Sequence, residues 1–204
     1  MQLYLLTFSA LFSVVNPLGT VPLFLGLTKE KTKKEIQGVA LWTSINTFLI
    51  LVISFWFGQY ILTFFGISLS ALKLTGGLIM ASSGFAMLSG NYTKHKGMKK
   101  REKDDAFTKD NVSLTPLALP MLSGPGTISL LISYQIELQA MSDKIWVMGS
   151  IVSVCLLTLI ILVSSKVINN VLGASGMTGL SRIIGFVVIA IGLEYILGVL
   201  TELF

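Results

Sequence analysis

Two short motifs interrupt apolar runs of this sequence, and both combine proline and glycine with hydrogen-bonding side chains. The first is Asn16-Pro17-Leu18-Gly19-Thr20-Val21-Pro22, and the second is Ser123-Gly124-Pro125-Gly126-Thr127. Proline removes a backbone donor and clashes with the preceding helical turn, while glycine lets a ligand or a second backbone approach closely. Inside a helix, each motif would therefore free backbone amides and carbonyls that could hold a small polar molecule.

The chemistry that these motifs offer is hydrogen bonding without formal charge, because neither contains an acidic or basic residue. Free amides at a helix N-terminus carry partial positive charge, and free carbonyls at a C-terminus carry partial negative charge. An amino-acid zwitterion needs both. The candidate substrate-binding residues are Asn16, Pro17, Gly19, Thr20, Ser123, Gly124, Gly126 and Thr127. The alternative interpretation is that the motifs only kink packed helices.

Two polar residues in other apolar runs are further candidates. Asn46 lies one turn after Thr43 on the same helix face, so it could reach the site or bond to a neighbouring helix. Glu194 lies well inside the last apolar run, where an unpaired carboxylate is costly. It could carry a coupling proton, bind a substrate ammonium or extend outward to water. We therefore take Asn46 as a candidate binding residue and Glu194 as a candidate coupling residue.

Catalytic and metal chemistry have little support in the sequence. It contains one cysteine, Cys155, and one histidine, His95, with no His-Glu-x-x-His, cysteine-pair or Gly-x-Ser-x-Gly motif. We expect no enzyme activity, no metal site and no cofactor, although a coupling ion or proton stays open. The net charge of +5 lies beside apolar segments, which favours a membrane surface over nucleic acid.

The elements that must position these residues are membrane helices. Hydrophobic residues make up 53% of the chain and charged residues only 12%, which is typical of a polytopic membrane protein. Six spans are predicted, at roughly 1–27, 37–62, 69–89, 113–137, 144–167 and 180–201. The fifteen residues before Asn16 would span roughly 22 Å, less than a hydrocarbon core roughly 30 Å thick. The first motif is therefore expected within the membrane.

The distribution of lysine and arginine predicts the orientation. With the N-terminus outside, only Lys73 and Lys144 of the fifteen basic residues lie outside. We therefore predict a multi-pass protein of the plasma (inner) membrane with both termini outside. Loops 28–36 and 90–112 are then cytoplasmic, and the second of these is a linker of mixed charge.

The two halves of the chain align with each other at an offset near 108. Pro17 aligns with Pro125, Gly19 with Gly126, Gly66 with Gly173, and Lys73 with Arg182, at offsets of 107 to 109. Because each half has three spans, the second must enter the membrane from the opposite side. The predicted fold is an all-α integral membrane protein, a single domain of 1–204. Its six transmembrane segments form two inverted three-helix repeats, 1–89 and 113–204, joined by linker 90–112, with the first and fourth segments broken by the Pro/Gly motifs. The alternative is that the two halves do not form a repeat and match only because apolar helices have similar compositions.

Both motifs, together with Lys73-Leu74-Thr75-Gly76-Gly77 and Pro116-Leu117-Ala118-Leu119-Pro120, resemble the MarC family over nearly the whole chain. Its SnatA-like branch transports small neutral amino acids such as glycine and alanine. The resemblance implies a six-span, two-repeat fold and coupling to an ion or proton gradient. It also implies that the two motifs flank the substrate.

The leading hypothesis is thus a secondary transporter of small neutral amino acids that works by alternating access. The substrate would bind at the two broken helices near the midplane, with one repeat rocking against the other. The alternative is a channel-like permease or exporter for another small uncharged solute. The expected partners are the amino acid and the lipid bilayer but not nucleic acid, and a homo-oligomer stays open.

Overall fold

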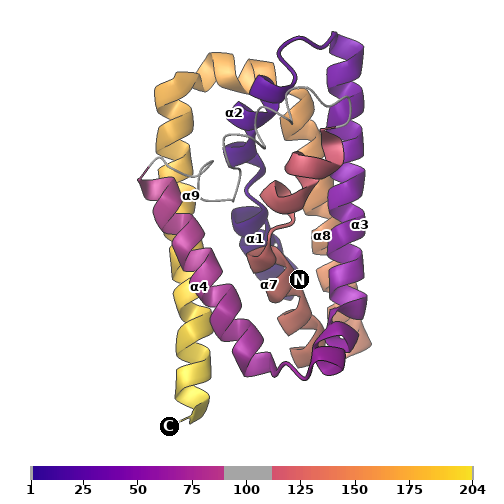
Figure 1. Cartoon of the computed structure of the whole chain (residues 1–204), viewed down its shortest axis with the longest axis vertical. Coiled ribbons are helices and arrows are strands. Elements are labelled where there is room, and N and C mark those ends of the chain that lie inside the picture. The colour runs from indigo at the N-terminus through magenta and orange to yellow at the C-terminus, as the bar shows by residue number, and fades with distance from the viewer. Residues whose placement is uncertain (1, 90–111, 204) are drawn as a thin grey trace.

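The computed structural model describes residues 2–89 and 112–203, and all of its regular elements are helical (Figure 1). Along the chain they are α1 (Gln2–Val15), α2 (Pro17–Leu27), α3 (Lys33–Phe65), α4 (Leu69–Leu88), η1 (Ser113–Leu122), α7 (Pro125–Glu137), α8 (Met141–Val163) and α9 (Ser165–Leu203). Five helical segments are long and apolar enough to cross a membrane, or six if η1 and α7 form one span bent by 63°. The predicted all-helical, multi-span architecture is confirmed. The predicted linker, 90–112, lies almost wholly outside the described residues.

Local capping chemistry sets the ends of α3, which is longer than the predicted span 37–62. The Thr32 amide donates to Glu35 Oε2 at 2.7 Å, and the Glu35 amide donates to Thr32 Oγ1 at 3.4 Å, which completes a capping box. At the other end, Gly66 adopts a left-handed conformation with φ 66° and stops the helix. The predicted span 37–62 lies within α3, and these caps, rather than the limits of the apolar run, set the ends of the helix.

The first and fourth segments are each divided into two helices, and the second helix of each begins at a proline. Helix α1 ends at Val15 and α2 begins at Pro17, with Asn16 between them in a left-handed conformation (φ 51°, ψ 61°). In the second half, Pro125 begins α7 after η1 has ended at Leu122. Proline is well tolerated at the first position of a helix because an amide there has no helical acceptor.

The observed ends of the fifth and sixth segments also differ from the predicted ones. Helix α9 begins at Ser165, and its φ of 63° at Gly173 separates a short first part from the candidate span Ser175–Thr201. Figure 1 shows this first part crossing one end of the molecule. Gly66 and Gly173 are the two glycines with positive φ within the described residues. They are also a pair that the sequence offset aligns.

Helices α4 and α9 form the most extensive contact between elements and lie side by side in Figure 1. A Cβ on Gly77 would lie 2.6 Å from the Gly192 carbonyl oxygen, and one on Gly84 would lie 2.5 Å from that of Gly185. The relation is reciprocal, since a Cβ on Gly192 would meet Gly77 and one on Gly185 would meet Gly84. Small residues let membrane helices pack backbone against backbone in this way.

The two halves of the chain are interlocked within the described residues. Helix α1 packs chiefly on α8, helix α3 on α7, α8 and η1, and helix α4 on α9 and α7. In contrast, α1, α3 and α4 have little contact with one another. The buried core accordingly mixes residues of both halves, among them Leu11, Phe55, Leu130 and Ile151. Neither half encloses a core of its own.

This packing predicts that Gly84→Ala destabilises the protein. Its methyl group would lie 2.5 Å from a backbone oxygen, which cannot move aside as a flexible side chain would. We expect a loss of about 1–3 kcal/mol, typical of overpacking, measured as a lower midpoint of thermal unfolding in detergent. The control is Gly198→Ala on α9, where a Cβ would meet nothing within 4 Å. Equal stability of the two variants would contradict the packing.

Candidate functional site

A cavity of about 460 Å³ lies between α1, α4, α9 and the break that separates η1 from α7. Its lining consists of Ser13, Val14, Leu78, Ile79, Met80, Ser82, Ser83, Met87, Pro120, Gly124, Pro125, Gly126, Thr127 and Val188. No formally charged side chain is among these described lining residues. The cavity is therefore suited to a ligand without net charge.

The N-terminus of α7 opens on this cavity without a side-chain cap. Gly124 is the N-cap residue and makes no side-chain hydrogen bond, and Pro125 contributes no N–H. The amides of Gly126 and Thr127 belong to the first helical turn, so they have no acceptor within the helix. This end of α7 therefore presents donors and partial positive charge to the cavity.

The C-terminus of α1 borders the same cavity through Ser13 and Val14. In a continuous helix the Ser13 carbonyl would accept a hydrogen bond from residue 17, but Pro17 has no N–H. The Ser13 hydroxyl is engaged separately, since it donates to the Ser9 carbonyl at 2.9 Å. The cavity thus lies between a helix end with free acceptors and a helix end with free donors.

In the first motif, in contrast, a side chain of the motif itself binds a backbone amide at the start of α2. Asn16 is 1% exposed, and its Oδ1 accepts from the Gly19 amide at 3.0 Å. The Thr20 hydroxyl donates to the Asn16 carbonyl at 3.2 Å. A Cβ on Gly19 would lie 2.2 Å from Asn16 Nδ2, so this cap requires glycine. Helix α2 therefore begins with its N-terminus already capped.

The sequence-predicted candidates are only partly brought together. Gly124, Gly126 and Thr127 line the cavity, whereas Asn16, Pro17, Gly19, Thr20 and Ser123 do not. Asn16 lies one residue behind the lining, because its Nδ2 donates to Met87 Sδ at 3.5 Å and Met87 borders the cavity. The first motif therefore adjoins the cavity through a methionine.

The remaining candidates lie elsewhere. Asn46 is half-buried on α3 and does not line the cavity, and Glu194 lies on the exposed face of α9. The lining residues that the sequence reasoning missed belong mainly to α4, including Met80, Ser83 and Met87. Gly77 and Gly84 of the same helix pack against α9, so α4 both contacts α9 and borders the cavity.

The model of the MarC family of integral membrane proteins matches residues 1–204 of this sequence. The chain belongs to the MarC family. It is 35% identical over 196 residues to a UPF0056 membrane protein of Methanocaldococcus jannaschii, covering 96% of this chain and 95% of the relative.

It is also 31% identical over 202 residues to the UPF0056 inner membrane protein MarC of Citrobacter koseri (95% and 91% covered). Identity to the UPF0056 membrane protein YhcE of Escherichia coli is 30% over 196 residues (95% and 89% covered). No solved structure matches the chain. The chain is thus an integral, multi-pass membrane protein, with relatives named as inner membrane proteins.

The capped break predicts coupling between two substitutions. Asn16→Ala leaves the buried Gly19 amide unpaired, and Gly19→Ala displaces the Asn16 side chain that caps it. Each variant should lose about 0.5–2 kcal/mol of stability, the usual cost of removing an N-cap. The measurement is a double-mutant cycle of thermal unfolding in detergent. Because both changes break one interaction, the double variant should lose much less than the sum. Additive losses would contradict the cap.

Proposed function

We propose that this protein is a secondary transporter of small neutral amino acids that binds its substrate in the cavity between α1 and α7. The observation that carries the proposal is the pairing of two helix ends across a cavity lined by no charged side chain. The substrate carboxylate would lie at the Gly126 and Thr127 amides. Its ammonium would lie at the carbonyls of Ser13 and Val14. Helix ends serve polar substrate groups in this way in broken-helix transporters.

The rest of the lining favours a small, apolar substrate side chain. Leu78, Met80, Met87 and Val188 provide hydrocarbon and thioether surface beside the polar helix ends. Methionine side chains are flexible and adapt to groups of different shape. Glycine and alanine satisfy these requirements, and an acidic or basic side chain would enter without a charged partner. The proposal therefore extends to small aliphatic amino acids but not to charged ones.

The proposal includes an inverted repeat, which the α4–α9 contact supports. Gly77 and Gly185 are 108 residues apart, as are Gly84 and Gly192. Gly77 contacts Gly192 while Gly84 contacts Gly185. This is the reciprocal pattern of a two-fold interface, in which position i of one copy meets position j of the other and the reverse. The pseudo-two-fold axis would then pass between α4 and α9.

Interlocking changes the expected motion. Rocking one half against the other would break most of the helix contacts in the molecule, because these contacts join the two halves. The proposed cycle instead moves α4 and α9 together relative to the other helices. The two glycines with positive φ in the described chain would serve as pivots, since Gly66 lies just before α4 and Gly173 lies just before the span Ser175–Thr201 of α9.

The proposed orientation places the basic end of the molecule in the cytoplasm. Figure 1 shows the α2–α3 turn and the first part of α9 at one end, and the α3–α4 and α7–α8 turns at the other. The first end carries Lys29, Lys31, Lys33, Lys34 and Lys166. An excess of lysine marks cytoplasmic loops. The α3–α4 turn would then face outward.

Proteoliposomes test the function directly. Vesicles loaded with unlabelled alanine should accumulate labelled glycine or alanine by counterflow, and the uptake should saturate. Unlabelled lysine or glutamate added outside should not reduce this uptake. A channel would instead give flux without saturation or counterflow. Absence of any neutral amino-acid counterflow would overturn the proposal.

Capping α7 gives a sharper prediction. Gly124 has an extended conformation (φ −74°, ψ 170°) that suits an asparagine N-cap. Gly124→Asn should occupy the α7 amides as Asn16 occupies those of α2. We expect KM to rise by about tenfold, equivalent to about 1.4 kcal/mol, without loss of thermal stability.

The matched control is Ala140→Asn, at the N-cap of α8, which also lacks a side-chain hydrogen bond. Ala140 does not line the cavity. This variant should keep the KM of the unsubstituted protein. An unchanged KM in the Gly124→Asn variant would show that the α7 amides do not hold the substrate.

A further inference from the structure

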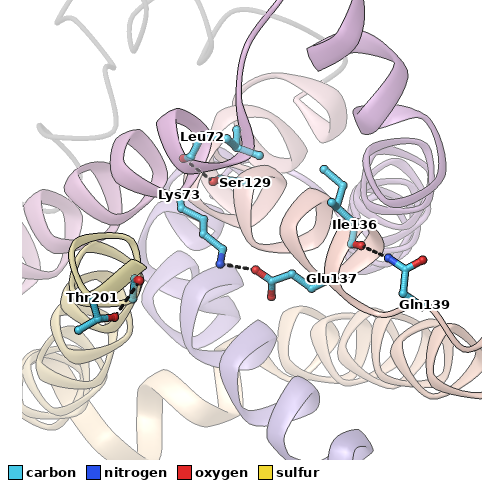
Figure 2. A network of polar contacts seen from close by, with 8 residues as sticks. Leu72, Lys73, Ser129, Ile136, Glu137, Gln139 and Thr201 are labelled. Carbon is cyan, nitrogen blue, oxygen red and sulfur yellow. Dashed lines mark hydrogen bonds and ion pairs between the residues drawn. The ribbon is translucent and has the colours of Figure 1, made fainter. Parts of the chain in front are cut away.

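Helices α4 and α7 are joined by three contacts at the end of the molecule that carries the α3–α4 turn. Figure 2 shows the first two of them. Lys73 forms an ion pair with Glu137. The Ser129 hydroxyl donates to the Leu72 carbonyl at 3.0 Å. A Cβ on Gly76 would lie 2.5 Å from Ser129 Cβ, so the two helices touch here. We call these three contacts the outer latch.

The outer latch lies to one side of the cavity along both of its helices. On α4, the latch residues 72–76 precede the cavity-lining residues 78–87. On the fourth segment, latch residues 129–137 follow the cavity-lining residues 120–127. Helix α4 has extensive contact with α7 but not with η1. The two segments therefore converge at the latch and diverge on the other side of it, around the cavity.

The Lys73–Glu137 pair has properties suited to a contact that opens. The two side chains are 16% and 38% exposed, so neither charged group is fully buried. Ion pairs that are partly solvated add little net stability. The pair can therefore hold one arrangement of α4 against α7 and still be broken without burying a lone charge.

The proposed repeat contains a second cation and carboxylate close to the equivalent positions. Arg182 and Glu30 each lie one residue away from the positions that the 108-residue offset of the α4–α9 glycine contacts pairs with Lys73 and Glu137. Arg182 lies on α9 and Glu30 follows α2, and these two helices are neighbours as α4 and α7 are. In the described part of the chain, both side chains are exposed and form no ion pair with each other.

We infer that the Lys73–Glu137 and Arg182–Glu30 pairs are alternating gates at opposite ends of the substrate cavity. This inference rests on the proposed transport by alternating access. The present structure has the outer pair closed and the second pair open. In the opposite state Arg182 binds Glu30 at the cytoplasmic end, while Lys73 and Glu137 separate. Each pair stabilises the state in which its own end of the cavity is shut.

Accessibility of a cysteine in the cavity tests the gates without any substrate. The reporter is Ser83→Cys in a Cys155→Ala background, labelled by a membrane-impermeant maleimide added outside right-side-out vesicles. Lys73→Glu should speed labelling by about fivefold or more, at the lower end of typical coupling between sites. The charge swap Lys73→Glu with Glu137→Lys should restore the slow rate. Lys144→Glu, which removes the other basic residue predicted outside, should leave it slow.

The second pair should give the opposite result. Arg182→Glu removes the pair that stabilises the outward-open state, so it should slow labelling of the same reporter from outside by about the same factor. Adding Glu30→Arg should reverse this effect. The inference would be overturned if Lys73→Glu and Arg182→Glu both left the labelling rate unchanged, or if neither charge swap restored the rate of the unsubstituted pair.

Disulfide trapping separates this inference from the proposed substrate. The pairs Lys73→Cys with Glu137→Cys and Glu30→Cys with Arg182→Cys are placed together in one Cys155→Ala chain. Oxidation should close either pair in a given molecule but not both. Double closure in the same molecules would contradict alternation. If closure alternates but no amino acid exchanges in vesicles, the gates stand and the amino-acid substrate is wrong. If amino acids exchange but closure does not alternate, the gates are wrong.

Discussion

A backbone polar group in lipid must find a partner within the protein, and this chain meets that constraint differently at its two breaks. At the first, the side-chain oxygen of Asn16 accepts a hydrogen bond from the Gly19 amide in the first turn of α2. At the second, Gly124 has no side chain to do so, and the α7 N-terminus opens on a cavity instead. Two motifs of similar composition thus do different work. The difference depends on whether the residue before the proline carries a side chain.

Helix α4 connects the parts of the molecule that the proposed cycle needs. Gly77 and Gly84 lie against α9, the methionines and serines of α4 border the cavity, and its first turns hold the outer latch. Since Met87 also contacts Asn16, a displacement of α4 would change contacts at the first break as well as at the second. A helix without large side chains on one face can be held firmly by a neighbour while its other face stays available to a ligand.

The sequence predicted those features that depend on local chemistry. Pro17 and Pro125 begin helices where their motifs predicted interruptions, and the family resemblance is confirmed over the whole chain. The sequence could not show whether the Asn16 side chain caps a helix or binds a substrate, because an asparagine side chain can do either. The exposed position of Glu194 was also hidden, because a helix that is apolar on all sides does not reveal which face is buried. Cavity residues such as Ser13 and Met87 come from helices distant in sequence, so only the tertiary arrangement identifies them.

The interlocked halves limit how such a molecule can change shape. Since neither half encloses its own core, separating them would expose the apolar residues that hold the protein together. A motion that keeps this core intact must move the two helices at its edge, α4 and α9, which hold each other through glycine. Their attachment through Gly66 and Gly173 makes rotation inexpensive, because positive φ costs glycine little. Inverted symmetry would then let one rotation close the outer pair and its reverse close the cytoplasmic pair. Two weak ion pairs would suffice to bias a pair of helices that moves as one body.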